Sequence, residues 1–114
     1  MQLVRVVNRT RGEVLAERAE LADSAWRRFF GLMGRRDLPA GGGLVLKPGG
    51  AIHMFFMHLP LDVLHVDRAG RVTHVVRGLR PWRLGPLFVG GALTIELPAG
   101  MANHTQPGDE IAIE

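Results

Sequence analysis

Glycine and proline divide this chain into short apolar segments, and that division constrains the fold more than any other feature. The sequence has 15 glycines and 7 prolines among its 114 residues. The apolar runs between them are a few residues long, which is typical of a turn-rich β protein and not of a helical bundle. The length predicts one domain, residues 1–114, with room for one core.

Composition excludes several classes of protein. Apolar residues make up 46% and charged residues 22%, which is near the globular average. The chain has no cysteine, which excludes disulfides, thiolate zinc sites, iron–sulfur ligation and cysteine nucleophiles. We find neither an apolar run of about 18 residues nor the pattern of a secretory leader. We therefore expect a cytoplasmic protein that does not associate with membranes.

The charge balance is weakly basic. The net charge is +3, and the sequence pI of 11.0 is high because nearly all the basic residues are arginines. Such an excess suits an anionic ligand or a nucleic acid without requiring either.

Alternation of apolar and polar residues predicts short strands, and one segment predicts a helix. Asp23 or Ser24 can cap this helix, which carries Trp26, Phe29, Phe30 and Met33 on one face and ends near Gly34. A short helical turn is expected over Pro98–His104. The predicted strands are Leu3–Val7, Val14–Ala19, Leu44–Leu46, Ile52–Met57, Leu61–Val66, Arg71–Val76, Ala92–Leu97 and Ile111–Ile113. The expected fold is mainly β, a small antiparallel β-sandwich or partly closed barrel with one main helix.

Five short motifs resemble, in order and spacing, those of the prokaryotic domain of unknown function family 192. They are Gly31–Arg35, Ile52–Val63, Arg80–Arg83, Glu96–Gly100 and Gly108-Asp109. The resemblance covers nearly the whole chain and implies a mostly antiparallel, jelly-roll-like β fold, but no reaction. Many members have Trp-Met-x-Asn-Thr where this chain has His53–Met57, so it resembles the branch with a His-x-Phe-Phe-Met motif. Members often have phenylalanine at the position of His65.

Four histidines in the central strands raise the hypothesis of a metal site: His53, His58, His65 and His74. The predicted hairpin pairs Val63 with His74 and His65 with Val72, which places the two histidines diagonally on one face, about 7–8 Å apart. A catalytic zinc needs three protein ligands, and Asp62 faces the other way. We therefore favour packed or half-exposed imidazoles and expect no cofactor.

Asp62 and Glu96 each have two interpretations. Asp62 either faces a pocket together with Glu96 or accepts backbone N–H bonds from a turn over residues 56–59. Thr94 and Glu96 share one face of their strand. If that face is exposed, Glu96 is an ordinary surface residue. If it lines a cleft, the carboxylate needs a cationic partner such as Arg80 or Arg83.

The segment Arg77–Arg83 combines arginines with Trp82. It suits a nucleobase or an anion, with the tryptophan as a stacking platform. It equally suits a loop whose tryptophan anchors on the core while the arginines stay solvated. We expect Trp82 to be partly buried, with one ring edge open beside Arg80. Nucleic acid is the less favoured partner, because its binders usually show a denser basic stripe.

Together these features favour a non-catalytic binding module for a small anionic ligand or a peptide end. Polar residues from separate segments can meet in one cleft of a small β scaffold. The ligand-binding residues predicted here are His53, Asp62, Arg80, Trp82 and Glu96. One alternative is a metal-assisted hydrolase that uses His53 and His58, or His65 and His74, with Asp62 or Glu96. Another is a nucleic-acid-binding module that uses Arg77–Arg83.

Overall fold

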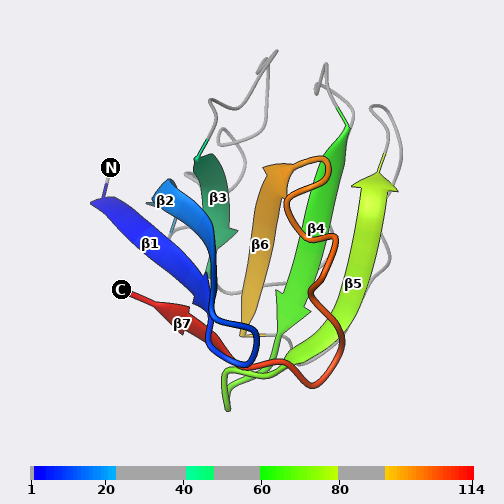
Figure 1. Ribbon diagram of the computed structural model, residues 1–114. Coiled ribbons are helices and arrows are strands. Elements are labelled where there is room, and N and C mark those ends of the chain that lie inside the picture. The colour runs from blue at the N-terminus through cyan, green and yellow to red at the C-terminus, as the bar shows by residue number, and fades with distance from the viewer. Residues whose placement is uncertain (1, 23–40, 48–59, 80–91) are drawn as a thin grey trace.

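A single curled sheet of seven strands is the framework of the protein in the computed structural model, which describes residues 2–22, 41–47, 60–79 and 92–114 (Figure 1). The strand order is β5-β4-β6-β3-β2-β1-β7. Every neighbouring pair is antiparallel except β2 and β3, which are parallel. The strands are β1 (Gln2–Asn8), β2 (Glu13–Ala22), β3 (Gly42–Leu46), β4 (Leu61–Val66), β5 (Val72–Leu79), β6 (Leu93–Pro98) and β7 (Ile111–Ile113).

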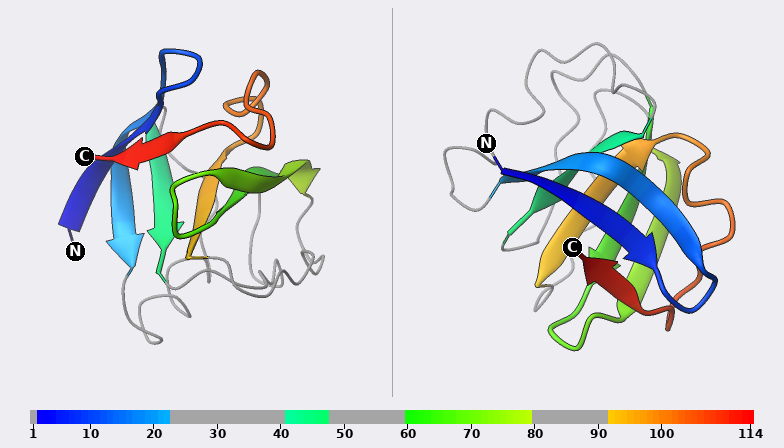
Figure 2. Two further views of the ribbon diagram at one scale, coloured as in Figure 1. Left: turned by 90° about the horizontal axis from the view of Figure 1, so that it is seen from below. Right: turned by 60° about the vertical axis from the view of Figure 1, so that its left-hand side comes forward.

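The two outermost strands of this sheet, β5 and β7, are joined at one end of the molecule. The Val72 N–H donates to the Asp109 carbonyl over 2.9 Å, and the Gly108 N–H donates back to the Val72 carbonyl over 2.7 Å. The Ile111 N–H donates to the Gly70 carbonyl over 2.8 Å. Figure 2 shows the resulting curl of the sheet. The described residues thus confirm a mainly β fold and form a half-barrel that is closed at this end only.

The described residues contain no helix, although the sequence predicts one main helix. That helix is expected between its cap at Asp23 or Ser24 and Gly34. These residues lie outside the described residues, so the structure does not support it. The segment expected as a short helical turn forms two separate turns instead. They are closed by bonds from the Met101 N–H to the Pro98 carbonyl and from the Thr105 N–H to the Ala102 carbonyl. No helix in the described part is long and apolar enough to cross a membrane.

The predicted strands agree with the observed ones except at their ends. β4 and β7 have the predicted bounds, and β2 extends past the predicted Ala19 to Ala22. The strand predicted over residues 52–57 lies outside the described residues.

The register of the β4–β5 hairpin differs from the predicted one. His65 pairs directly with His74, not with Val72. The turn is one residue longer than predicted, since Val66 pairs with Val72, and Thr73 is a further unpaired residue of β5 next to the turn. The Thr73 hydroxyl donates to the His65 carbonyl over 3.1 Å. The shift amounts to two positions along β5, so the two histidines stay on the expected face but are direct neighbours.

Both faces of the sheet are buried at its centre, where β3, β4 and β6 lie. On the inner face, Val72 of β5 and Ile111 of β7 belong to one apolar cluster, so both ends of the strand order pack against the same core. Every position of β3 and β4 is buried, which is the pattern of strands covered on both sides. The outer face, opposite the cluster, carries Leu44, Leu46, Leu61, Val63, His65, Thr94 and Glu96 in buried positions.

A glycine permits the close contact between β3 and β6. A Cβ at Gly43 would lie 2.9 Å from the Glu96 carbonyl oxygen and 3.1 Å from Leu97 Cδ2. The backbone atom cannot yield without moving β6. We therefore expect Gly43→Ala to lower the free energy of unfolding by about 1–3 kcal/mol, the usual cost of overpacking a core. Urea unfolding followed by circular dichroism measures this, and a change below about 0.5 kcal/mol would show that the strands adapt.

Candidate functional site

A row of polar side chains crosses the outer face of the sheet. The register aligns His74 of β5, His65 of β4 and Thr94 of β6 directly across three neighbouring strands. The two imidazole rings meet edge to face with their centroids 6.2 Å apart. His65 Nδ1 lies 3.4 Å from Thr94 Oγ1.

Glu96 lies beside this row in an aliphatic setting. It follows Thr94 by two residues on the same face and pairs with Val63 on one side and Leu44 on the other. We call His65, His74, Thr94 and Glu96 the outer-face cluster.

Burial deepens along the cluster. His74 is exposed at the edge, whereas His65, Thr94 and Glu96 are at most 1% exposed. Burial lowers the pKa of His65 below its usual value, and the charge of neighbouring His74 lowers it further. His65 is therefore neutral at pH 7 and offers one ring nitrogen as donor and the other as acceptor.

The outer-face cluster resolves one of the two alternatives for Glu96. The face that it shares with Thr94 is not solvent-exposed, so the interpretation as an ordinary surface residue is wrong. Its surroundings instead combine a few polar groups with largely aliphatic neighbours.

Asp62 is placed on the opposite face and is occupied by the backbone. It pairs with Leu97 of β6, one position away from the Val63–Glu96 pair, so the structure does not bring Asp62 and Glu96 to one face. Its Oδ1 accepts the Gly78 N–H over 2.9 Å. Its Oδ2 accepts the N–H groups of Gly100 and Ala102 over 2.9 and 3.0 Å. Such a carboxylate fixes the 100–102 turn to β4 and β5.

The other predicted ligand residues, His53, Arg80 and Trp82, lie outside the described residues, as do residues 56–59, the predicted donors to Asp62. The partial burial expected of Trp82 stays a prediction for the same reason. Arg77 is described, and its guanidinium donates to the carbonyls of Ala102 and Thr105. Among the described residues, no three His, Asp or Glu side chains are placed to hold a metal ion.

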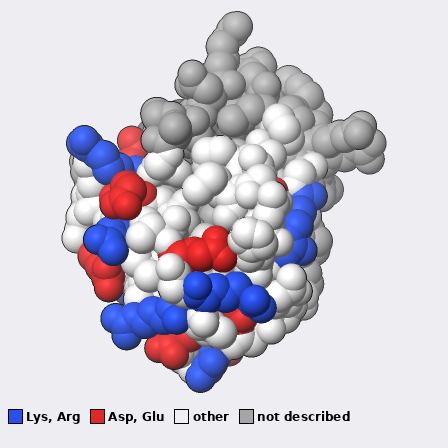
Figure 3. All heavy atoms as spheres, in the orientation of Figure 1, with Lys and Arg blue, Asp and Glu red and all other residues white. Residues whose placement is uncertain are grey.

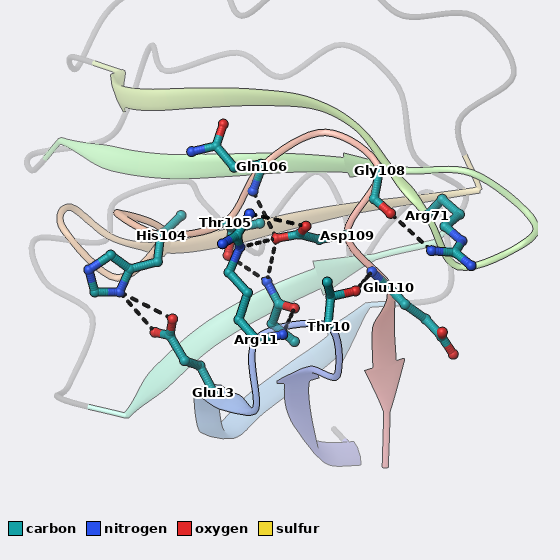
Figure 4. A network of polar contacts seen from close by, with 12 residues as sticks. Thr10, Arg11, Glu13, Arg71, His104, Thr105, Gln106, Gly108, Asp109 and Glu110 are labelled. Atoms are coloured by element: carbon teal, nitrogen blue, oxygen red, sulfur yellow. Dashed lines mark hydrogen bonds and ion pairs between the residues drawn. The ribbon is translucent and has the colours of Figure 1, made fainter.

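A second polar network, which the sequence reasoning missed, lies at the closed end of the half-barrel (Figure 4). Asp109 is 5% exposed and accepts bonds from the Asn8 amide over 3.0 Å, the Gln106 N–H over 3.0 Å and Arg11 Nε over 2.7 Å. The Asn8 amide also lies 3.1 Å from Thr105 Oγ1. The Gly108-Asp109 pair was the sequence signal for this network, but it served only as one of the motifs that resemble the family.

The environment of Asp109 determines its ionisation. Burial by itself raises the pKa of Asp109, but the hydrogen bonds from Asn8, Gln106 and Arg11 and the charge of Arg11 outweigh it and lower the pKa below its usual value.

Figure 3 shows acidic and basic side chains interspersed over the lower part of the visible surface, so this view has no large patch of one sign there. The polar network around Asp109 links the 105–109 segment to the β1–β2 hairpin, which is a structural role.

Comparisons with known proteins identify a family without assigning an activity. The family model DUF192, described as "Uncharacterized ACR", matches residues 6–113. A UPF0127 protein of Thermococcus sibiricus is 33% identical over 112 residues, covering 93% of this chain and 72% of that protein. A UPF0127 protein of Thermococcus gammatolerans is 33% identical over 113 residues, covering 94% of this chain and 73% of that protein.

Two solved structures share the fold. A protein of unknown function from Novosphingobium aromaticivorans has a TM-score of 0.80 at 25% identity, covering 96% of this chain and 83% of that chain. A putative transcription regulator from Sinorhizobium meliloti has a TM-score of 0.78 at 24% identity, covering 97% of this chain and 92% of that chain. The second likeness shows the fold alone.

Proposed function

The chain belongs to the DUF192 family, and we propose that it is a non-catalytic binding module that holds a small ligand or a peptide end at the outer-face cluster. The burial of Glu96 carries this proposal. A carboxylate that is 0% exposed between Val63 and Leu44 has lost its water, at a cost of several kcal/mol if it is charged. Packing alone favours an aliphatic residue there, so the acid serves polar contacts, with other groups of the chain and, in this proposal, with a ligand.

The geometry favours binding over catalysis. Thr94 and His65 resemble a nucleophile and its base, but their 3.4 Å separation exceeds the usual range of about 2.6–3.2 Å. Both side chains are also fully buried. These groups are suited to orienting a ligand by hydrogen bonds in an aliphatic setting.

The nucleic-acid alternative has less support. Arg77, the first cation of the segment predicted to contact phosphates, donates to two carbonyls of its own chain. The likeness to a putative transcription regulator is a likeness of fold. A metal-assisted hydrolase has less support too, because the described residues bring no three suitable ligands together.

A thermal-shift screen of small acids, amines and short peptides tests the proposal. A ligand that binds only the native state at about 100 times its Kd adds about 2.7 kcal/mol of stability, which raises the Tm of a domain of this size by roughly 10 °C. Thr94→Val keeps the shape of the side chain and removes its hydroxyl. We expect this variant to lose most of the ligand-induced shift.

The control is Thr10→Val, because Thr10 is an exposed threonine in the β1–β2 turn, away from the cluster. It should keep the full ligand-induced shift. A screen without any shift, or a shift that survives Thr94→Val unchanged, contradicts binding at the outer-face cluster.

A further inference from the structure

An apolar row crosses the outer face of β7, β1 and β2 and is open to solvent. Val7 pairs with Val14 of β2 on one side and with Ala112 of β7 on the other. Their chain neighbours Val6 and Ile111 belong to the core cluster, so by alternation the row lies on the outer face. Val14 is 37% exposed, and Val7 and Ala112 are half-buried. The outer face is therefore open here, whereas at the centre of the sheet it is buried.

Charged side chains flank this row in two strips of opposite sign. On β1, Arg5 and Arg9 lie two residues before and after the valine of the row. On β7, Glu110 and Glu114 lie two residues before and after the alanine. The Arg5 N–H donates to the Glu114 carbonyl over 2.9 Å and the Arg9 N–H to the Glu110 carbonyl over 2.8 Å, so each arginine stands opposite a glutamate. A basic–apolar–basic strip thus lies beside an acidic–apolar–acidic strip.

The ion pairs within the chain leave these charges available to a partner. The Glu114 carboxylate lies 3.7 Å from Arg5 Nε and 3.7 Å from an Nη atom of Arg9. The three side chains are 45–57% exposed. Exposed pairs of this kind contribute little to stability, so turning them toward a second molecule costs little.

We propose that this face binds a second copy of the chain, about a two-fold axis that runs parallel to the strands between β1 and β7. We call it the β1–β7 face, and it consists of Arg5, Val7, Arg9, Val14, Glu110, Ala112 and Glu114. A half-turn about this axis lays β1 of each copy over β7 of the other and keeps each residue's position along the strands. Arg5 then faces the second copy's Glu114, and Arg9 faces the second copy's Glu110.

The pattern of the β1–β7 face favours a second copy over another partner. Each strip meets the strip of opposite sign, and the two apolar centres, Val7 and Ala112, meet between them. A partner of one charge sign would match one strip and repel the other, and like charges brought together cost several kcal/mol. This inference goes beyond the proposed function and is independent of it.

The β1–β7 face is small, so the self-association is weak and needs a high protein concentration. Sedimentation velocity of the whole chain measures it from about 20 μM to about 1 mM. We expect the mean sedimentation coefficient to rise with concentration in about 0.05 M salt and to rise less in about 0.5 M salt, because salt screens the ionic contacts. A wild type that stays monomeric over this range overturns the proposal.

Two single variants test the contact between Arg9 and the second copy's Glu110. Arg9→Glu brings two acids together and Glu110→Arg brings two arginines together, so each is expected to weaken self-association by about tenfold or more. An equimolar mixture should associate again, because every changed side chain then faces an opposite charge. Overall attraction does not explain such a recovery. The wild type carries a net charge of +3 and each substitution changes it by two units, so both variants stay positive.

The control is Lys47→Glu, which makes the same change of charge at an exposed position beyond β3, a strand that β2 separates from β1. It should associate as the wild type does. Arg9→Glu that associates as strongly as the wild type overturns the proposal, as does a mixture that associates no more than its components. If either variant fails to fold by circular dichroism, Arg5→Glu with Glu114→Arg gives the same test at the other end of the strips.

Discussion

Replacing Asp62 by alanine is expected to lower the free energy of unfolding by about 3–5 kcal/mol. The carboxylate is 1% exposed and accepts three backbone N–H groups. Each buried donor that loses its acceptor costs about 1–3 kcal/mol, and the exposed positions of Gly78 and Gly100 let water restore part of this. Because the whole domain has only about 5–15 kcal/mol of stability, the variant is expected to be close to unfolding. Urea unfolding at pH 7 measures the loss.

Asp67→Ala is the matched control for this loss. The Asp67 carboxylate also accepts backbone N–H groups, those of Ala69 and Arg71, but its bonds lie in an exposed turn. We expect a cost of about 0.5–1.5 kcal/mol there, because water replaces the lost acceptor. Asp62→Asn keeps one acceptor oxygen and should fall between the two alanine variants. Equal losses in Asp62→Ala and Asp67→Ala would contradict the role assigned to buried backbone donors.

The strands of this fold are predictable from sequence because each is specified locally. Apolar runs bounded by turn residues placed β4 and β7 at their observed bounds. The pairing is less local. In the hairpin the turn residues were identified, but a turn one residue longer than predicted and the bulge at Thr73 together moved the partner of His65 by two positions along β5. Alternation therefore predicts which face a side chain occupies, whereas a bulge decides which side chain it meets.

The candidate site was predictable only in part for a related reason. Alternation placed Thr94 and Glu96 on one face, but no local pattern shows that β6 lies between β4 and β3. That order decides that the face is buried and that Thr94 meets His65, which is 29 residues away in the chain. The sequence also suggested that Asp62 accepts backbone N–H groups. The observed donors include Gly100 and Ala102, which are 38 and 40 residues away in the chain. Residues close to Asp62 in the sequence therefore could not indicate them.

Asp109→Ala is expected to lower the free energy of unfolding by about 2–4 kcal/mol at pH 7. The substitution removes the acceptor shared by the Asn8 amide, the Gln106 N–H and the Arg11 guanidinium. Asn8 is fully buried, so its amide bears most of the cost. Arg11 contributes little, because its side chain is 38% exposed and water screens its charge. Since Asp109 lies where β5 and β7 are joined, the amide hydrogens of Val72 and Ile111 should also exchange faster with solvent.

The pH dependence of the same loss gives an independent check. The pKa of Asp109 lies below its usual value in the folded protein, so the folded state binds the proton less readily than the unfolded state. Its stabilising contribution is therefore complete above about pH 4–5 and decreases as the pH falls through the folded-state pKa. We expect the difference in unfolding free energy between the wild type and Asp109→Asn to be constant from pH 5 to 8 and to shrink below about pH 4. A difference that grows on acidification would mean that burial, and not the bonds from Asn8, Gln106 and Arg11, dominates the ionisation of this carboxyl.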